Sequence, residues 1–332
     1  ERWRWLLGFA RRCNARAAHH AALARCAILQ RSRALLRQWL LEEGIECDYA
    51  QRGTLHVYRD ARVLASDRAH AEWLQRLGIA TEMLDADAVL EREPALKPGA
   101  VGGIAHPDDA QLRPDRLVAG LARRVRERGG AIEEHARIEG FARDGRRVAA
   151  VRTQRGDFSG EHVVLALGAW SPRVAGHLAL RLPMQPGKGY SITTSRPDVC
   201  PRTALVLREA GVCVTAWDSG FRLGSTMEFS GYDATLNRTR LDALRRGAQA
   251  CLRTPFGGET REEWWGWRPM CVDEVPLIGP AASRHDNLLL ATGHGMLGVS
   301  MSAATGELVA ATIRGAPVAI DPGPYLPARF GL

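Results

Sequence analysis

Arg268 is the residue whose surroundings best suit it to chemistry, because it follows a segment, residues 264–267, that contains three tryptophans. A guanidinium beside large apolar rings is poorly screened, and its planar fork matches a carboxylate bidentately. Arg268 is therefore a candidate anchor for an acidic substrate in a dry pocket. A structural role is the alternative, with Arg268 stacked on a tryptophan or paired with Asp273 or Glu274. The Tyr190 hydroxyl could bind the same carboxylate, although a lone tyrosine is more often structural.

A second candidate site is the turn at residues 293–298, GHGMLG, which follows the apolar run 288–291. Three of its six residues are glycines, so its backbone can approach a ligand closely. The helix predicted after it would direct free N–H groups and its positive dipole end at the same place. This arrangement favours a cofactor ring, and an ordinary strand–helix joint is the alternative. His294 is either an acid or base, or part of a turn that only spaces the backbone, which is the more economical interpretation.

The composition argues against several other classes of function. The net charge is +8, but the arginines are spread over the whole chain without a basic module, so we expect no nucleic-acid partner. The seven cysteines are scattered and never form a C-x-x-C pair, which predicts reduced thiols in a cytosolic setting. Neither a hydrolase motif nor a metal-spaced cluster occurs, so we expect no metal and no catalytic side-chain dyad.

The elements that must position these residues include two matching strands. Residues 163–166 form an apolar run that ends in a glycine turn at 167–172, as the run at 288–291 does. Apolar runs of this kind are typical of strands buried on both faces. Two such strands ending in glycine turns predict one sheet whose carboxyl edge carries a ligand. Before them, four short strands are expected, the first at residues 131–133.

The rest of the chain divides into a helical start and a separate layer. Residues 1–44 have a helical pattern. Their arginine-rich start, with Trp3, Trp5 and Leu6, is either an interfacial amphipathic helix or an ordinary helix with solvated arginines. Strands and a helix between 182 and 265 predict an antiparallel layer. No run of about 18 apolar residues exists, so no membrane-spanning helix is expected.

Four segments carry a family likeness: VVLALGAWSP (163–172), PMQPGKGYSIT (183–193), WWGWRPMCVDEVPLIGP (264–280) and NLLLATGHGMLGVSMSAATGELVA (287–310). In sequence and order they resemble the FAD-dependent D-amino-acid oxidase and glycine oxidase superfamily, within it the D-amino-acid dehydrogenase (small subunit) branch. The resemblance implies an α/β (α+β) fold, in which a Rossmann-like FAD-binding domain is interleaved with an antiparallel-sheet substrate domain. We expect a helical segment at 1–44, a substrate domain at 45–105 and 182–265, and an FAD domain at 106–181 and 266–332.

Family members begin with a strand and a G-x-G-x-x-G turn that binds the FAD pyrophosphate, with an acidic residue about 20 positions further on. This chain instead begins with residues of helical pattern. We therefore expect an N-terminally truncated member without the first βαβ unit.

The resemblance also implies roles for individual residues. FAD is expected to bind non-covalently and to accept a hydride from a D-amino acid, giving a 2-oxo acid and ammonia, with no catalytic side chain. Substrate binding is assigned to Arg268 and Tyr190. The residues that match cofactor-binding positions are Ile138, Ala166, Leu167, Gly168, Trp170, Gly293, His294, Gly295, Met296 and Leu297.

The implied setting is bacterial D-amino acid catabolism. A small D-amino acid is the expected substrate, and a quinone or another acceptor takes the electrons. The protein is expected in the cytoplasm or peripherally on the inner face of the plasma membrane. Two alternatives stay open: a glycine- or sarcosine-type amine oxidase that uses oxygen, and a non-catalytic remnant that does not hold FAD.

Overall fold

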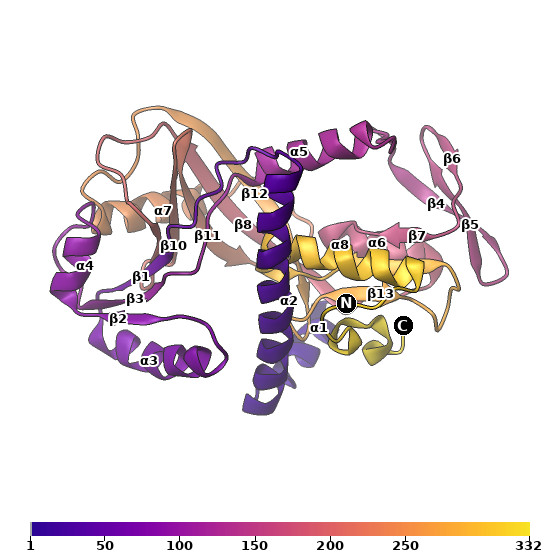
Figure 1. Cartoon of the computed structure of the whole chain (residues 1–332), viewed down its shortest axis with the longest axis horizontal. Helices are drawn as coiled ribbons and strands as arrows, with labels where there is room; N and C mark the ends of the chain where they lie inside the picture. Colours follow the sequence, from indigo (N-terminus) through magenta and orange to yellow (C-terminus); the bar gives the residue numbers. More distant parts are fainter. Residues whose placement is uncertain (1) are drawn as a thin grey trace.

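The computed structural model describes residues 2–332 and contains three separate β-sheets with helices packed against them. Figure 1 shows the largest sheet at one end of the molecule, a small sheet near the centre, and a narrow meander at the other end. The long helix α2 (Ala15–Glu42) runs between the large sheet and helix α8 (Gly298–Arg314). Mixed α/β architecture is thus confirmed.

The large sheet has eight strands in the order β12-β8-β11-β10-β9-β1-β3-β2. Neighbouring strands are antiparallel except β1 and β9, which are parallel. Chain segments far apart in sequence therefore share one sheet. Its strands are β1 (Thr54–Tyr58), β2 (Glu82–Leu84), β3 (Gly102–His106), β8 (Met184–Thr194), β9 (Ala204–Leu207), β10 (Val212–Trp217), β11 (Gly220–Glu228) and β12 (Thr260–Cys271).

Helices cover parts of this sheet. Helix α7 (Arg238–Cys251) buries Leu241, Leu244 and Ala248 against strand residues that include Tyr190 and Leu223. These helix residues recur every three or four positions, which is the spacing of one helical face. The remaining helices of this half are α3 (Ala61–Arg76) and α4 (Ala86–Arg92).

The small central sheet has the order β13-β14-β7, with β13 (Leu277–Pro280), β14 (Leu288–Thr292) and β7 (Val163–Leu165). Strands β14 and β7 are parallel, as the two matching apolar runs predict, with Leu288 opposite Val163. Helix α8 packs on α2, where Met301, Ala304 and Leu308 join one buried cluster with residues of α2. An ion pair between Arg31 and Glu307 also joins the two helices.

The helical start is confirmed as two helices, α1 (Arg2–Ala10) and α2. The break between the two helices has a local cause, since the side chain of Asn14 accepts a hydrogen bond from the backbone N–H of Ala17 at 3.0 Å and caps α2.

The remaining elements are α5 (Pro114–Glu127), α6 (Ser171–Ala175), the meander β4 (Ile138–Asp144), β5 (Arg147–Thr153) and β6 (Gly156–Phe158), and the 3₁₀ turns η1 (Gly168–Trp170), η2 (Gly176–Leu178), η3 (Gly295–Leu297), η4 (Gly323–Tyr325) and η5 (Pro327–Phe330).

Two sequence predictions are wrong in detail. Residues 131–133 are not a strand, and Ile132 is 37% exposed. An extended segment becomes a strand only where a neighbour accepts its hydrogen bonds, and no described strand pairs with this one. The predicted domain boundary after residue 265 falls inside β12, which continues to Cys271 in register with β8.

Helix α8 is more apolar than the sequence prediction allowed. Together with the preceding turn it spans Gly295–Arg314 and contains an 18-residue stretch with a mean hydropathy of 1.3, so by length and composition it could cross a membrane. It is the one such helix among residues 2–332, and 28% of this stretch is buried. Its contacts with α2 and β13 also fit the core helix of a folded domain.

Candidate functional site

The two glycine turns lie side by side at the carboxyl ends of β7 and β14, because these strands are parallel and in register. The hydroxyl of Thr292 donates a hydrogen bond to the Gly168 carbonyl at 3.0 Å. It also lies 2.9 Å from the hydroxyl oxygen of Ser171, which is fully buried. Thr292 therefore joins the turn at 167–170 to the end of the strand that leads into the turn at 293–297.

Glycine is required at several positions in these turns. Gly168, Gly293 and Gly295 have φ angles of +53°, +82° and +56°, which L-residues with side chains adopt at a cost. A Cβ at Gly293 would also lie 3.4 Å from the backbone nitrogen of Leu277. Helix α8 begins without a side-chain cap, so its first backbone N–H groups stay available to a ligand.

His294 is held as a structural residue of the second turn. Its Nε2 atom lies 2.9 Å from the hydroxyl oxygen of Thr305, and its backbone pairs with that of Met270 in β12. Burial lowers the pKa of His294 to about 4. The imidazole is therefore neutral near pH 7, which favours the spacing role over that of an acid or base.

The surface of both turns is open. Trp170 is 51% exposed and Met296 is 66% exposed, and Ala166 is exposed as well. The Trp170 ring meets the edge of Trp267 at 5.4 Å between ring centroids, and the Tyr232 hydroxyl donates to the Ala169 carbonyl at 2.6 Å. Trp267 of β12 and Tyr232 of the loop between β11 and α7 thus support the first turn.

Arg268 comes close to the second turn through β12, where it lies two residues before Met270. Its Nη1 atom donates to the Thr226 carbonyl at 2.9 Å, and a Cβ at Gly189 would collide with the guanidinium. Burial lowers the pKa of the Arg268 guanidinium, which stays charged. Among residues 2–332, no carboxylate lies within 4.0 Å of it.

The predicted structural alternatives for Arg268 are not realised. Asp273 pairs with Arg329 at 2.9 Å, and Glu274 pairs with Arg25 at 2.7 Å. No ring lies under the Arg268 guanidinium in the described part of the chain. Apart from its hydrogen bond to the Thr226 carbonyl, the half-buried guanidinium has no anionic partner among residues 2–332, which suits the binding of an anion.

Tyr190 does not share this position, so its predicted partnership with Arg268 is wrong. Arg268 lies opposite Gly187 and Tyr190 lies opposite Trp265 in the β8–β12 pair, three residues apart. Successive side chains alternate between the two faces of a strand, so an odd separation places Tyr190 and Arg268 on opposite faces. The Tyr190 hydroxyl lies 3.1 Å from a Glu228 carboxylate oxygen, on the face that α7 covers.

Ile138 lies away from the turns, and the resemblance assigns its backbone to the adenine of FAD, a role that stays a prediction. It begins β4 opposite Thr153, in the meander that Figure 1 shows at the far end of the molecule. The structure thus gathers the two turns and Arg268, and leaves Ile138 and Tyr190 elsewhere.

Two contributing residues were missed by the sequence reasoning. Thr226 holds Arg268 through its carbonyl, and no sequence pattern marks it. Thr292 has a recognisable signal, because it is a hydroxyl residue directly before Gly293. The glycines at 293, 295 and 298 also have the G-x-G-x-x-G spacing between a strand and a helix, which was overlooked.

Known proteins similar to this chain agree with this geometry. The family model described as DAO, FAD dependent oxidoreductase, matches residues 8–312. A D-amino acid dehydrogenase of Granulibacter bethesdensis is 32% identical, covering 99% of this chain and 79% of the relative. One of Rhizorhabdus wittichii is 34% identical, covering 98% and 79%.

Among solved structures, glycine oxidase from Geobacillus kaustophilus has a TM-score of 0.83 at 24% identity, covering 90% of this chain and 81% of that one. A likeness at this identity concerns the fold. The family match over most of the chain, the relatives and the paired turns lead to one conclusion: the chain belongs to the DAO family of FAD-dependent oxidoreductases.

Proposed function

We propose that this protein oxidises a small D-amino acid to the 2-oxo acid and ammonia. The observation that carries the proposal is Arg268, a half-buried guanidinium without a carboxylate partner among residues 2–332, beside the turn at 293–297. The name of the relatives, D-amino acid dehydrogenase, supports the substrate class.

The residues of both turns fit the ring end of FAD. The positive φ angles of Gly168, Gly293 and Gly295 leave bare backbone at the open surface, and the uncapped start of α8 offers N–H groups there. Bound FAD would supply the hydride acceptor for the substrate Cα–H. The side chains add orientation: Arg268 binds the carboxylate, and the Thr226 carbonyl fixes the guanidinium. We assign no proton transfer to His294, because its pKa of about 4 makes it a weak base and its Nε2 atom faces the Thr305 hydroxyl.

The test is the substitution Arg268→Leu, with Arg261→Leu as matched control on the same strand. Loss of a charge-assisted bidentate contact is worth about 3 kcal/mol, so KM for the D-amino acid should rise about a hundredfold. Arg261 is exposed and bonds to the Ser219 carbonyl at 2.7 Å, so its variant should keep the KM. An unchanged KM in Arg268→Leu at equal flavin content would remove Arg268 from this role.

For the electron acceptor we propose a quinone. Reduced enzyme, prepared without oxygen, would be mixed with air or with a soluble quinone analogue, and flavin reoxidation followed in each case. Faster reoxidation by the quinone supports a dehydrogenase. Rapid turnover with oxygen would instead favour the glycine- or sarcosine-type oxidase.

We also propose a cytoplasmic protein that docks peripherally on an anionic membrane through α1. The outer side of α1 carries Trp3, Leu6 and Leu7, which are 73%, 37% and 61% exposed. Exposed arginines at positions 2 and 11 flank them. Apolar side chains beside cations are the pattern of an interfacial helix. All seven cysteines are free thiols, which supports a reducing compartment.

A further inference from the structure

A cavity with a volume of about 1040 Å³ lies between α1, the loop that joins η2 to β8, and the C-terminal turn η5. None of the residues assigned to the substrate or the cofactor lines it. It is therefore a separate site from the one beside Arg268.

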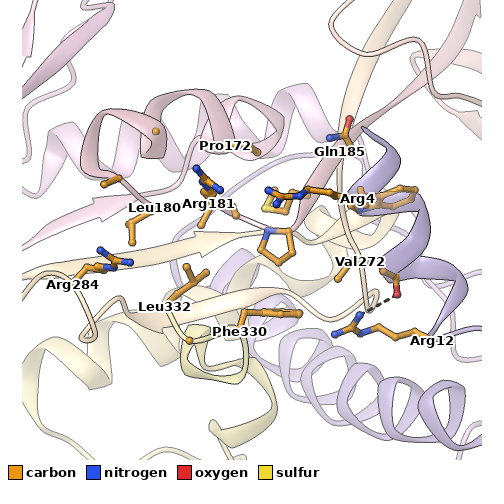
Figure 2. A pocket seen from close by; sticks show the side chains of 18 residues that line it. Arg4, Arg12, Pro172, Leu180, Arg181, Gln185, Val272, Arg284, Phe330 and Leu332 are labelled. Carbon is orange, nitrogen blue, oxygen red and sulfur yellow. Dashed lines mark hydrogen bonds between the residues drawn. The ribbon is translucent and has the colours of Figure 1, made fainter. Parts of the chain in front are cut away.

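Four arginines line this cavity, namely Arg4, Arg12, Arg181 and Arg284, and no acidic residue does in the part of the chain that the structure describes. Figure 2 shows Arg4 extending from α1 toward Arg181 across the cavity. Like charges repel, and an anion bound between the two guanidinium groups would relieve this repulsion.

Three of these four guanidinium groups have no partner among residues 2–332. Arg12 donates to the Gly8 carbonyl at 3.0 Å and lies over the Phe330 ring. The side chains of Arg4, Arg181 and Arg284 have neither a hydrogen bond nor an ion pair with any residue from 2 to 332. A planar guanidinium can donate two parallel hydrogen bonds to phosphate oxygens. The cavity therefore offers several unused N–H donors that could bind a phosphate group.

The floor of the cavity is apolar. Trp5 and Leu182 are 7% and 8% exposed, and Pro183, Val272 and Phe330 complete this surface. Figure 2 shows Phe330 and Val272 on the side of the cavity opposite Pro172. A cationic rim over an apolar floor recognises a ligand that carries both an anionic and an apolar part.

We propose that this cavity binds the phosphate head group of an anionic phospholipid, with Arg4 and Arg181 holding the phosphate and the apolar floor holding the first part of the acyl chains. The choice of a lipid rests on the membrane docking proposed for α1, whose inner side contributes Arg4, Trp5 and Gly8 to the cavity. The site would hold one lipid molecule while the outer side of α1 lies on the bilayer.

The test is calorimetric titration of the purified chain with dihexanoyl phosphatidylglycerol below its micelle concentration. Dihexanoyl phosphatidylcholine and inorganic phosphate are the comparison ligands. The double variant Arg4→Gln/Arg181→Gln should weaken phosphatidylglycerol binding about tenfold or more, from the loss of two charge-assisted contacts. Arg2→Gln/Arg11→Gln, a matched pair at the start of α1 and directly after its end, lies outside the cavity and should change the Kd less than about twofold. Arg4 and Arg181 are exposed, so thermal unfolding should be unchanged.

Several results would overturn the proposal. They are the absence of saturable binding, equal weakening by the Arg2/Arg11 variant, and equal affinity for phosphatidylcholine. Inorganic phosphate binding as tightly as the lipid would assign the site to free phosphate. Trp3→Ser/Leu7→Ser should lower vesicle binding but leave the monomeric lipid titration unchanged, so a failure of membrane docking is distinguishable from a failure of the cavity site.

Discussion

At the residue scale, His294 shows how its surroundings decide what a side chain can do. A histidine between two glycines in a ligand-facing turn suggests acid–base chemistry. Burial lowers its pKa to about 4, so it is neutral where the enzyme would work, and its Nε2 atom faces the Thr305 hydroxyl.

This pKa predicts a pH dependence of stability. The folded-state value of about 4 lies below the ordinary value of 6.5, so the unfolded state binds more protons between these pH values. The stability contribution is complete above pH 6.5 and is lost as the pH falls toward 4, by at most about 3 kcal/mol. In urea titrations, His294→Gln should lose less stability from pH 7 to pH 4.5 than the unchanged chain. His177→Gln, at an exposed position, is the control. If the free energy of unfolding falls equally with pH in the unchanged chain, His294→Gln and His177→Gln, the lowered pKa of His294 is refuted.

Thr226 gives a second prediction at this scale. It is β-branched, yet its φ angle is +62°, and its buried hydroxyl has no partner in the described structure. This strain costs about 1–3 kcal/mol. Thr226→Gly should therefore raise the free energy of unfolding by about 1 kcal/mol in urea titrations. Glycine keeps the backbone carbonyl that accepts from Arg268, so KM should change less than about twofold. A less stable variant would refute the strain at residue 226.

Residue roles could be predicted from the sequence only in part. Arg268 was found because three tryptophans before it signal a low-dielectric setting. The partnership with Tyr190 was wrong because it depends on the pairing register of β8 with β12, and register is a property of two strands together.

At the element scale, the site depends on two parallel strands that end together. Their apolar composition and terminal glycines are local features, so β7, β14 and both turns could be predicted from the sequence. The strand predicted at 131–133 does not form, although its composition suits a strand. A strand also needs a neighbouring strand to pair with, and the local sequence does not reveal that neighbour.

Thr292 makes the two turns one unit, which can be tested. Thr292→Val removes a buried hydroxyl that bonds to Gly168 and lies against Ser171, so it should cost about 1–3 kcal/mol and weaken FAD binding. Thr312→Val, at an exposed hydroxyl bonded within α8, should leave FAD affinity unchanged. Equal FAD affinity in both variants, measured by fluorescence titration, would contradict this role of Thr292.

At the scale of the whole molecule, the large sheet brings segments around residues 54 and 264 together and delivers Arg268 to the turns of the small sheet. Hydrophobic periodicity does not predict that these distant segments share one sheet, since this depends on which strands pair. The expectation that two domains are interleaved along the chain came from the family resemblance of the four ordered segments.

The outer side of α1 gives a prediction at the same scale. Trp3→Ser/Leu7→Ser should reduce flotation with vesicles that contain phosphatidylglycerol by about tenfold, because both exposed apolar side chains are lost. Val118→Ser on α5 removes a side chain that is 63% exposed and should leave flotation unchanged. Equal flotation of all variants would exclude α1 as the docking element.

The most direct test of the proposed function is an anaerobic titration of the chain, mixed with FAD, with D-alanine and separately with L-alanine. The visible absorbance of a bound flavin should bleach with the D isomer, and Arg268→Leu should need much more substrate for the same bleaching. No bound flavin would indicate a non-catalytic remnant, and equal bleaching by both isomers, or none, would contradict oxidation of a D-amino acid.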